Sequence, residues 1–140
     1  MKRLAIAVAL AALVGCSGGE ATPSGPATYE TAAQLKDAAV GAGYDCPQWS
    51  DADPDVGSPL GFDAGKCLDG PRDQMRVYRD TTAREADMSG ASHSCYLLDH
   101  AGSIDLVILT ANNWLVCGPK ASVTALRDKL GGELVEPKAP

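Results

Sequence analysis

The sequence of 140 residues is poor in the side chains that most hydrolases use for covalent and acid–base catalysis. It has only two histidines, His93 and His100, and both lie in one short stretch. No strand–turn–helix segment carries the G-x-S-x-G pattern that exposes a nucleophilic serine. Acidic residues are plentiful, but nothing marks two of them as the pair needed for glycoside hydrolysis. We therefore expect no catalytic residues and no cofactor.

Positive charge is also scarce, with 12 lysines and arginines against 18 acidic residues. If an N-terminal signal containing Lys2 and Arg3 is removed, 10 basic residues face 18 acidic ones, a net charge of −8. Such a surface gains nothing from a phosphate backbone, so nucleic acid is not expected as a partner. The same negative charge argues against docking on anionic lipid by charge alone.

Long apolar runs are missing except at the start of the chain. Lys2 and Arg3 precede an uncharged run of eleven residues, Leu4 to Val14, which ends at Gly15-Cys16. This layout is typical of a secretory signal, and the run is shorter than the roughly 20 residues that span a bilayer.

Leu13-Val14-Gly15-Cys16 resembles the lipobox of bacterial exported lipoproteins. The resemblance implies cleavage before Cys16 and lipidation of Cys16 with acyl chains such as palmitate. It therefore predicts a protein held on the extracytoplasmic side of the cell membrane. The alternative is an ordinary secreted protein with a chance cysteine at the end of its signal. For the rest of the chain we name no family.

The composition divides the sequence into three parts. Residues 1–15 form the signal peptide. Residues 16–28 contain the lipidated cysteine and a spacer rich in Gly, Pro and Ser, which cannot bury apolar surface. Residues 29–140 are enough for one domain with a single core.

Four cysteines follow Cys16: Cys46, Cys67, Cys95 and Cys117. None forms a C-x-x-C pair, which argues against a zinc ribbon or a thioredoxin-type site. An even number in a small exported chain predicts two disulfides, for which three pairings are possible. We predict Cys46–Cys67, which brackets a long loop, and by elimination Cys95–Cys117. The second pair would exclude a meander with Cys95 on its outer strand, because the Cα atoms would lie too far apart. The Cys95 segment would then be a loop or a strand beside Trp114–Cys117.

Hydrophobic periodicity and capping signals predict three helices and two hairpins. The first helix starts at Thr31 with a capping box to Gln34 and ends at Gly43. The remaining segments, in chain order, are a loop at 46–65, strands at 66–68 and 75–79, a short helix at 82–88, a loop at 89–94, strands at 95–98, 104–109 and 114–117, a helix from Pro119 to Gly131, and an edge strand at 134–135. The order α-β-β-α-β-β-α predicts an α+β fold, a two-layer sandwich of a small antiparallel sheet and helices.

Asp51, Asp53 and Asp55 alternate as in the opening of a calcium-binding EF-hand loop. That pattern also requires a glycine and a bidentate glutamate, where this sequence has Val56 and Phe62. A solvated acidic loop is the favoured interpretation.

Three further clusters have a structural and a functional interpretation. His93, Cys95, Asp99 and His100 are possible metal ligands, but a disulfide at Cys95 would remove one, and no metal is expected. Arg72, Arg76, Arg79 and Arg84 are able to clamp an anion or to pair with the neighbouring Asp69, Asp73 and Asp80, and we favour the second interpretation. Tyr44, Trp49 and Trp114 form either a sugar-stacking surface or part of the core, and we favour the core.

The sequence favours a membrane-anchored envelope lipoprotein whose domain binds an envelope protein, peptide or other component without catalysing a reaction. Two alternatives stay open: a small hydrolase of envelope polymers, and a module that binds a small ligand or a metal.

Overall fold

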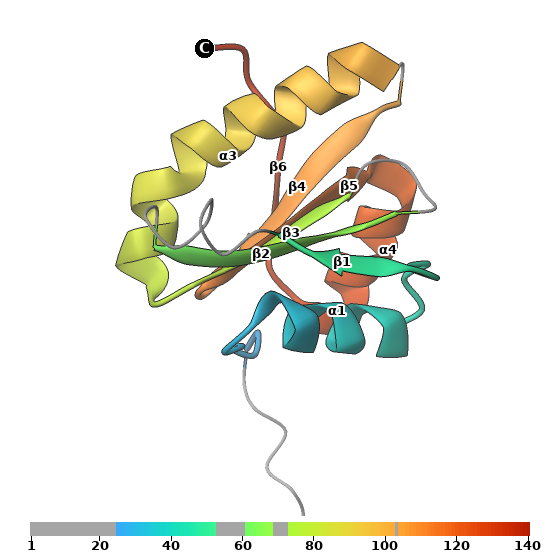
Figure 1. Cartoon of the computed structure of the whole chain (residues 1–140), viewed down its shortest axis with the longest axis vertical. Coiled ribbons are helices and arrows are strands. Elements are labelled where there is room, and N and C mark those ends of the chain that lie inside the picture. Colours follow the sequence, from blue (N-terminus) through green and yellow to red (C-terminus); the bar gives the residue numbers. More distant parts are fainter. Residues whose placement is uncertain (1–24, 53–60, 69–72, 103) are drawn as a thin grey trace, which may run out of the picture.

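The computed structural model describes residues 25–52, 61–68, 73–102 and 104–140 (Figure 1). The elements in chain order are α1 (Ala32–Gly41), β1 (Trp49–Asp51), β2 (Phe62–Cys67), β3 (Gln74–Tyr78), α3 (Thr81–Gly102), β4 (Leu106–Ala111), β5 (Trp114–Pro119), α4 (Lys120–Leu130) and β6 (Glu133–Val135). The strands form one six-stranded sheet in the order β1-β2-β3-β5-β4-β6, and all neighbours are antiparallel. The predicted α+β class, a small antiparallel sheet covered by helices, is confirmed.

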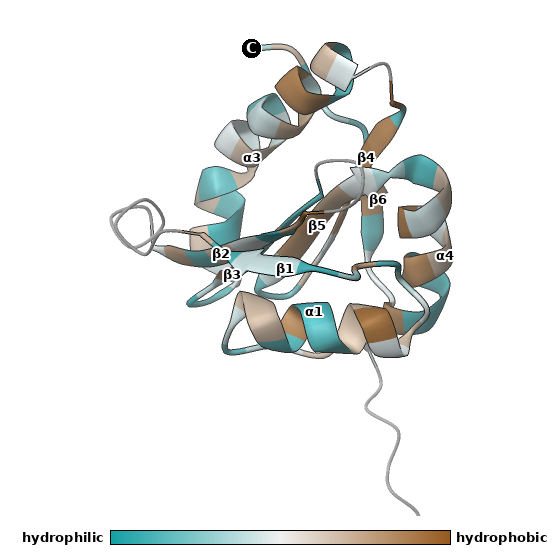
Figure 2. Cartoon of the chain, turned by 45° about the vertical axis from the view of Figure 1, so that its right-hand side comes forward, coloured by the Kyte–Doolittle hydropathy of each residue, from teal (hydrophilic) through white to brown (hydrophobic). Residues whose placement is uncertain are grey.

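The helices lie on both faces of the sheet, so the molecule has three layers where the sequence suggested two. α1 and α4 cover one face, and α3 covers the other (Figures 1 and 2). The larger core lies under α1 and α4 and contains Leu35, Trp114 and Val123. The smaller core lies under α3 and contains Ile108 and Cys95. β4 is buried at all six positions, because both of its faces are covered.

The ends of α1 follow the predicted signals. The Thr31 side chain accepts a hydrogen bond from the backbone N–H of Gln34. The Gln34 side chain reaches back to the N–H of Glu30, one residue before the expected partner. Beyond the helix, Gly43 has a φ of 95° and lets the chain turn toward the sheet.

α3 is the main correction to the predicted elements. The structure has one helix of 22 residues here. The sequence had predicted three separate elements, a short helix at 82–88, a loop at 89–94 and a strand at 95–98. In this helix the buried residues Ala91 and Cys95 are four positions apart, which is the spacing of one helix face. The small polar residues in this stretch made it resemble a loop. The helix is capped by Asp80, whose carboxylate accepts from the N–H of Ala83 at 2.8 Å.

The predicted loop at 46–65 contains β1 and most of β2. β1 pairs with the end of β2, with Ser50 opposite Lys66. The pairing depends on Gly65, because a Cβ there would lie 2.0 Å from the indole ring of Trp49. The other hairpin agrees with the prediction: Asn112, at a φ of 36°, turns β4 into β5. Leu134 and Val135 belong to the edge strand β6, which pairs with β4.

Two disulfides join the predicted pairs, Cys46 with Cys67 and Cys95 with Cys117. The Cα atoms of the second pair are 6.0 Å apart. Cys95 is neither in a loop nor on a neighbouring strand, the two places expected for it. It lies on α3, which places its sulfur directly above Cys117 of β5.

Candidate functional site

The chain enters the domain along a segment, Pro26–Tyr29, that is attached to the β4–β5 turn. The side chain of Asn112 donates to the carbonyl of Pro26, and Nε1 of Trp114 donates to that of Ala27 at 2.8 Å. Asn113 exchanges two hydrogen bonds with the backbone of Tyr29, at 2.7 and 3.2 Å. The same Asn113 amide donates to the carbonyl of Tyr78 at 2.9 Å, so one buried side chain joins the entry segment to the end of β3.

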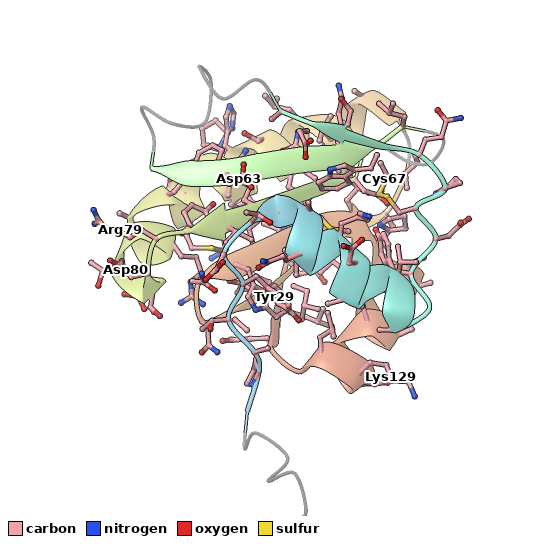
Figure 3. All side chains as sticks on the ribbon, turned by 60° about the horizontal axis from the view of Figure 1, so that its bottom comes forward. Tyr29, Asp63, Cys67, Arg79, Asp80 and Lys129 are labelled. Carbon is pink, nitrogen blue, oxygen red and sulfur yellow. A yellow bond between two sulfur atoms is a disulfide. The ribbon has the colours of Figure 1, made fainter. Side chains whose placement is uncertain are left out.

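A groove of about 920 Å³ lies beside this attachment. Its lining side chains come from the entry segment, the first turn of α1 and the β3–α3 connection: Thr28, Tyr29, Glu30, Gln34, Arg79 and Asp80. A smaller hollow of about 350 Å³ shares Glu30 and Arg79 and extends the groove to Phe62 and Asp63 of β2. Figure 3 shows Tyr29, Asp63, Arg79 and Asp80 around the start of α1. We call this combined surface the entry groove.

Two of the three carboxylates of the entry groove, those of Asp63 and Asp80, hold helix ends in place. Oδ2 of Asp63 accepts a hydrogen bond from the N–H of Ala32, the first residue of α1, at 2.7 Å. Asp80 caps α3 and also pairs with Arg79 at 3.0 Å. The hydrogen bond from the Ala83 N–H, followed by that from Arg79, lowers the pKa of Asp80 below its usual value. Asp80 therefore stays ionised, which suits a recognition surface better than a general acid, whose pKa must be raised.

Tyr29 supplies the aromatic surface of the entry groove. Its ring packs edge-on against Trp114, with ring centroids 6.0 Å apart. Partial burial raises the pKa of the Tyr29 hydroxyl, so this group is a neutral hydrogen-bonding group at physiological pH. An aromatic face beside neutral and charged polar groups is suited to binding a peptide or another polar molecule.

Tyr44 and Asp73 form a separate hydrogen-bonded pair in the core that also contains Cys67 of the first disulfide. The Tyr44 hydroxyl donates to Oδ2 of Asp73 at 2.6 Å, while Oδ1 of Asp73 is buried without a partner. Asp73 is 2 % exposed, and this burial raises its pKa to about 6; the Tyr44 hydrogen bond opposes the shift, and the charge of Asp45 adds to it. Burial, with the nearby Asp73, also raises the pKa of Tyr44.

The described arginines pair with acidic side chains of the chain, and Arg79 pairs with Asp80, one of the three expected partners, while none pairs with Asp73. Arg76 pairs with Asp87 of α3 at 2.8 Å, and the Tyr78 hydroxyl donates to the same carboxylate oxygen. Burial and this hydrogen bond raise the pKa of Tyr78. Arg84 contacts Glu85 at 3.5 Å, and Arg76 also lies over the Phe62 ring. Arg72, like Asp53 and Asp55 of the acidic loop, lies outside the described residues.

The remaining predicted clusters are placed as follows. Cys95 is taken up by its disulfide, and Asp99 accepts from the N–H of Leu106 at 3.0 Å. The ring of His100 stacks on Tyr96, one turn earlier on α3. Across the described parts of the chain, no three His, Cys, Asp or Glu side chains come together as metal ligands. Of the three aromatic residues, Trp114 and Tyr44 are buried and Trp49 packs against the core.

Sequence reasoning missed the entry groove because its parts are far apart in the chain. Asn112 and Asn113 were interpreted only as turn residues. The sequence did contain one signal for this attachment, the pair of adjacent asparagines. A two-residue turn does not require both, and side-chain amides can also bind the backbone of another segment.

Comparisons with known proteins give no indication of function, so functional inference depends on the groove. No family model, curated protein or solved structure matches this chain. Among the residues of the described ranges, no helix is both long and apolar enough to cross a membrane.

Proposed function

We propose that this chain is an exported lipoprotein, anchored to the cell membrane through lipid on Cys16 and facing the extracytoplasmic side. Its domain binds an envelope protein, peptide or other component through the entry groove without catalysing a reaction. The lipobox-like segment ending at Cys16 supports the anchor. The two disulfides support export, because such bonds are rare in the reducing cytosol.

The observation that carries the binding role is the position of the groove relative to the anchor. Thr28, Tyr29 and Glu30 line it, and they directly follow the spacer. Nine residue steps separate Cys16 from Gly25, which limits the distance between their Cα atoms to about 30 Å. A lipid on Cys16 therefore keeps the groove close to the membrane surface, where it meets components held at or near the bilayer.

Binding is favoured over hydrolysis because two of the three groove carboxylates are already engaged, which leaves only that of Glu30. Asp63 and Asp80 each accept a hydrogen bond from the first turn of a helix. A hydrolase needs a nucleophile or a carboxylate pair that is free to act on the substrate.

A photo-crosslinking amino acid in the full-length lipoprotein tests the groove in living cells. Placed at Glu30, on the wall of the groove, it should yield a crosslinked species of defined mass after irradiation. The matched position is the exposed Lys129 on α4, outside the groove (Figure 3), which should yield none. No product at Glu30, or the same products at both positions, would rule out the groove as the binding surface.

A further inference from the structure

The two walls of the entry groove come from parts of the chain that are far apart in sequence (Figure 3). One wall contains Tyr29 of the entry segment. The other begins where β3 ends, at Tyr78, and continues into Arg79. Their separation therefore depends on contacts between distant segments. Asn113, which is 8 % exposed and also lines the groove, lies where the two walls meet.

Asn113 binds the main chain of both walls. Its side chain accepts a hydrogen bond from the N–H of Tyr29 at 3.2 Å and donates to the carbonyl of Tyr29 at 2.7 Å. The same amide donates to the carbonyl of Tyr78 at 2.9 Å, and the Asn113 carbonyl accepts from the N–H of Tyr78 at 2.7 Å. Both main-chain polar groups of each tyrosine are thus bound to this one residue. The bonds use the oxygen and both N–H donors of the side-chain amide, a set that a carboxylate or a hydroxyl does not provide.

The wall formed by the entry segment depends on Asn113 in particular. Within the described ranges, residues 26–29 form no hydrogen bond between main-chain groups. The bonds from other side chains of the β4–β5 turn go to Pro26 and Ala27, which are not part of the groove lining. Among the described residues, Asn113 alone forms hydrogen bonds with Tyr29, which does line the groove.

The β4–β5 turn does not itself require an asparagine at position 113. Among the described non-glycine residues, Asn112 alone has a positive φ, at 36°. Asparagine is favoured in that conformation, which explains position 112 but not the next one. The contacts with the two walls account for the amide of Asn113.

We propose that Asn113 is the positioning residue of the entry groove: it sets the separation of the two walls and so the fit of the ligand. It acts through Tyr29 and Arg79, whose side chains line the groove. The inference rests on the binding function proposed above. A ligand that contacts both walls and the bonds of Asn113 stabilise the same arrangement, so each strengthens the other.

The test combines Asn113→Ala with the photo-crosslinking amino acid at Glu30 in the full-length lipoprotein. The variant should lower the yield of the crosslinked species by at least about fivefold, the low end of typical coupling between sites. In the purified protein, the Tyr29 amide should exchange its hydrogen with solvent faster than in wild type. The amides of β4 and β5 should stay protected, because the hairpin itself remains folded.

Thr110→Val is the matched control, because it removes another buried side-chain bond from the same hairpin. Oγ1 of Thr110 donates to the carbonyl of Trp114 at 3.1 Å, and Thr110 does not line the groove. This variant should keep the wild-type crosslinking yield and the wild-type exchange at Tyr29. If Asn113→Ala does not fold, Asn113→Asp takes its place: it keeps the size and the acceptor but loses both donated bonds.

The inference is overturned if a folded Asn113 variant crosslinks as wild type does, or if Thr110→Val loses as much product. It is also overturned if exchange at Tyr29 is unchanged, since the bonds would then not hold that wall. Either result leaves the proposed function in place when the wild type still crosslinks at Glu30. No product at Glu30 in the wild type would refute the proposed function, and this inference with it.

Discussion

At the scale of single residues, the ionisation of the buried Asp73 is coupled to folding. Its pKa rises from 3.8 to about 6 on burial, so the neutral form is favoured in the native protein. The resulting stabilisation is fully present below pH 3.8 and is lost as the pH rises through about 6. The shift corresponds to at most about 3 kcal/mol.

We therefore expect Asp73→Asn, which can still accept the Tyr44 hydrogen bond, to gain stability relative to wild type as the pH rises from 4.5 to 7.5. The difference in the free energy of unfolding, measured by chemical denaturation across this range, should grow by about 1–3 kcal/mol. Asp128→Asn, which alters an exposed ion pair with Arg127, is the control and should show no such growth. Parallel stability curves for Asp73→Asn and wild type would contradict the raised pKa.

At the scale of elements, the two disulfides close loops of almost equal length but lie in different surroundings. The sequence separations are 21 and 22 residues, so the chain-entropy model gives each bond about 3 kcal/mol. Cys95 and Cys117 are 1 % and 2 % exposed, and their bond fastens α3 to the centre of the sheet. Cys67 is also buried, at 3 % exposed, but its partner Cys46 is only partly buried, near the edge strand β1.

Replacing both Cys95 and Cys117 by alanine should therefore destabilise the domain more than replacing both Cys46 and Cys67. We expect the excess to be about 1–2 kcal/mol, from the packing lost at buried positions. Denaturant unfolding of the two double variants gives the comparison, and peptide mapping without reductant checks the pairing itself. Equal losses would show that α3 does not depend on its disulfide for packing.

The elements that could be predicted are those whose signals are local. The Thr31 cap, the Asn112 turn and the position of Pro119 before α4 each depend on neighbouring residues. α3 and β1 escaped because their stability comes from distant contacts. Ala91 and Cys95 make α3 a helix by packing on β5 and its neighbours, and Trp49 holds β1 by covering Gly65. The third layer had one clue, the unbroken apolar run at 106–109, since such runs are typical of strands covered on both faces.

At the scale of the whole molecule, the proposed lipid anchor at Cys16 would set where the groove operates. Cys16→Ala removes the thiol that lipidation requires. In cell fractionation, we expect the variant either to be released from membranes or to accumulate as an uncleaved precursor. The Cys46→Ala, Cys67→Ala double variant retains Cys16 and should stay with the membranes. A Cys16→Ala protein that is processed normally and still sediments with membranes would disprove the lipoprotein assignment.

The attachment of Pro26–Tyr29 to the β4–β5 turn also sets the path of mechanical force. If the domain is pulled away from its anchor, tension enters at Asn112, Asn113 and Trp114. These residues join two strands in the interior of the sheet, so the load falls on the best-buried hairpin and not on an edge strand that peels away. A bound partner that pulls on the groove would load the same hydrogen bonds between Pro26–Tyr29 and the β4–β5 turn. A tether on the N-terminal side would therefore pass its load to the buried β4–β5 hairpin.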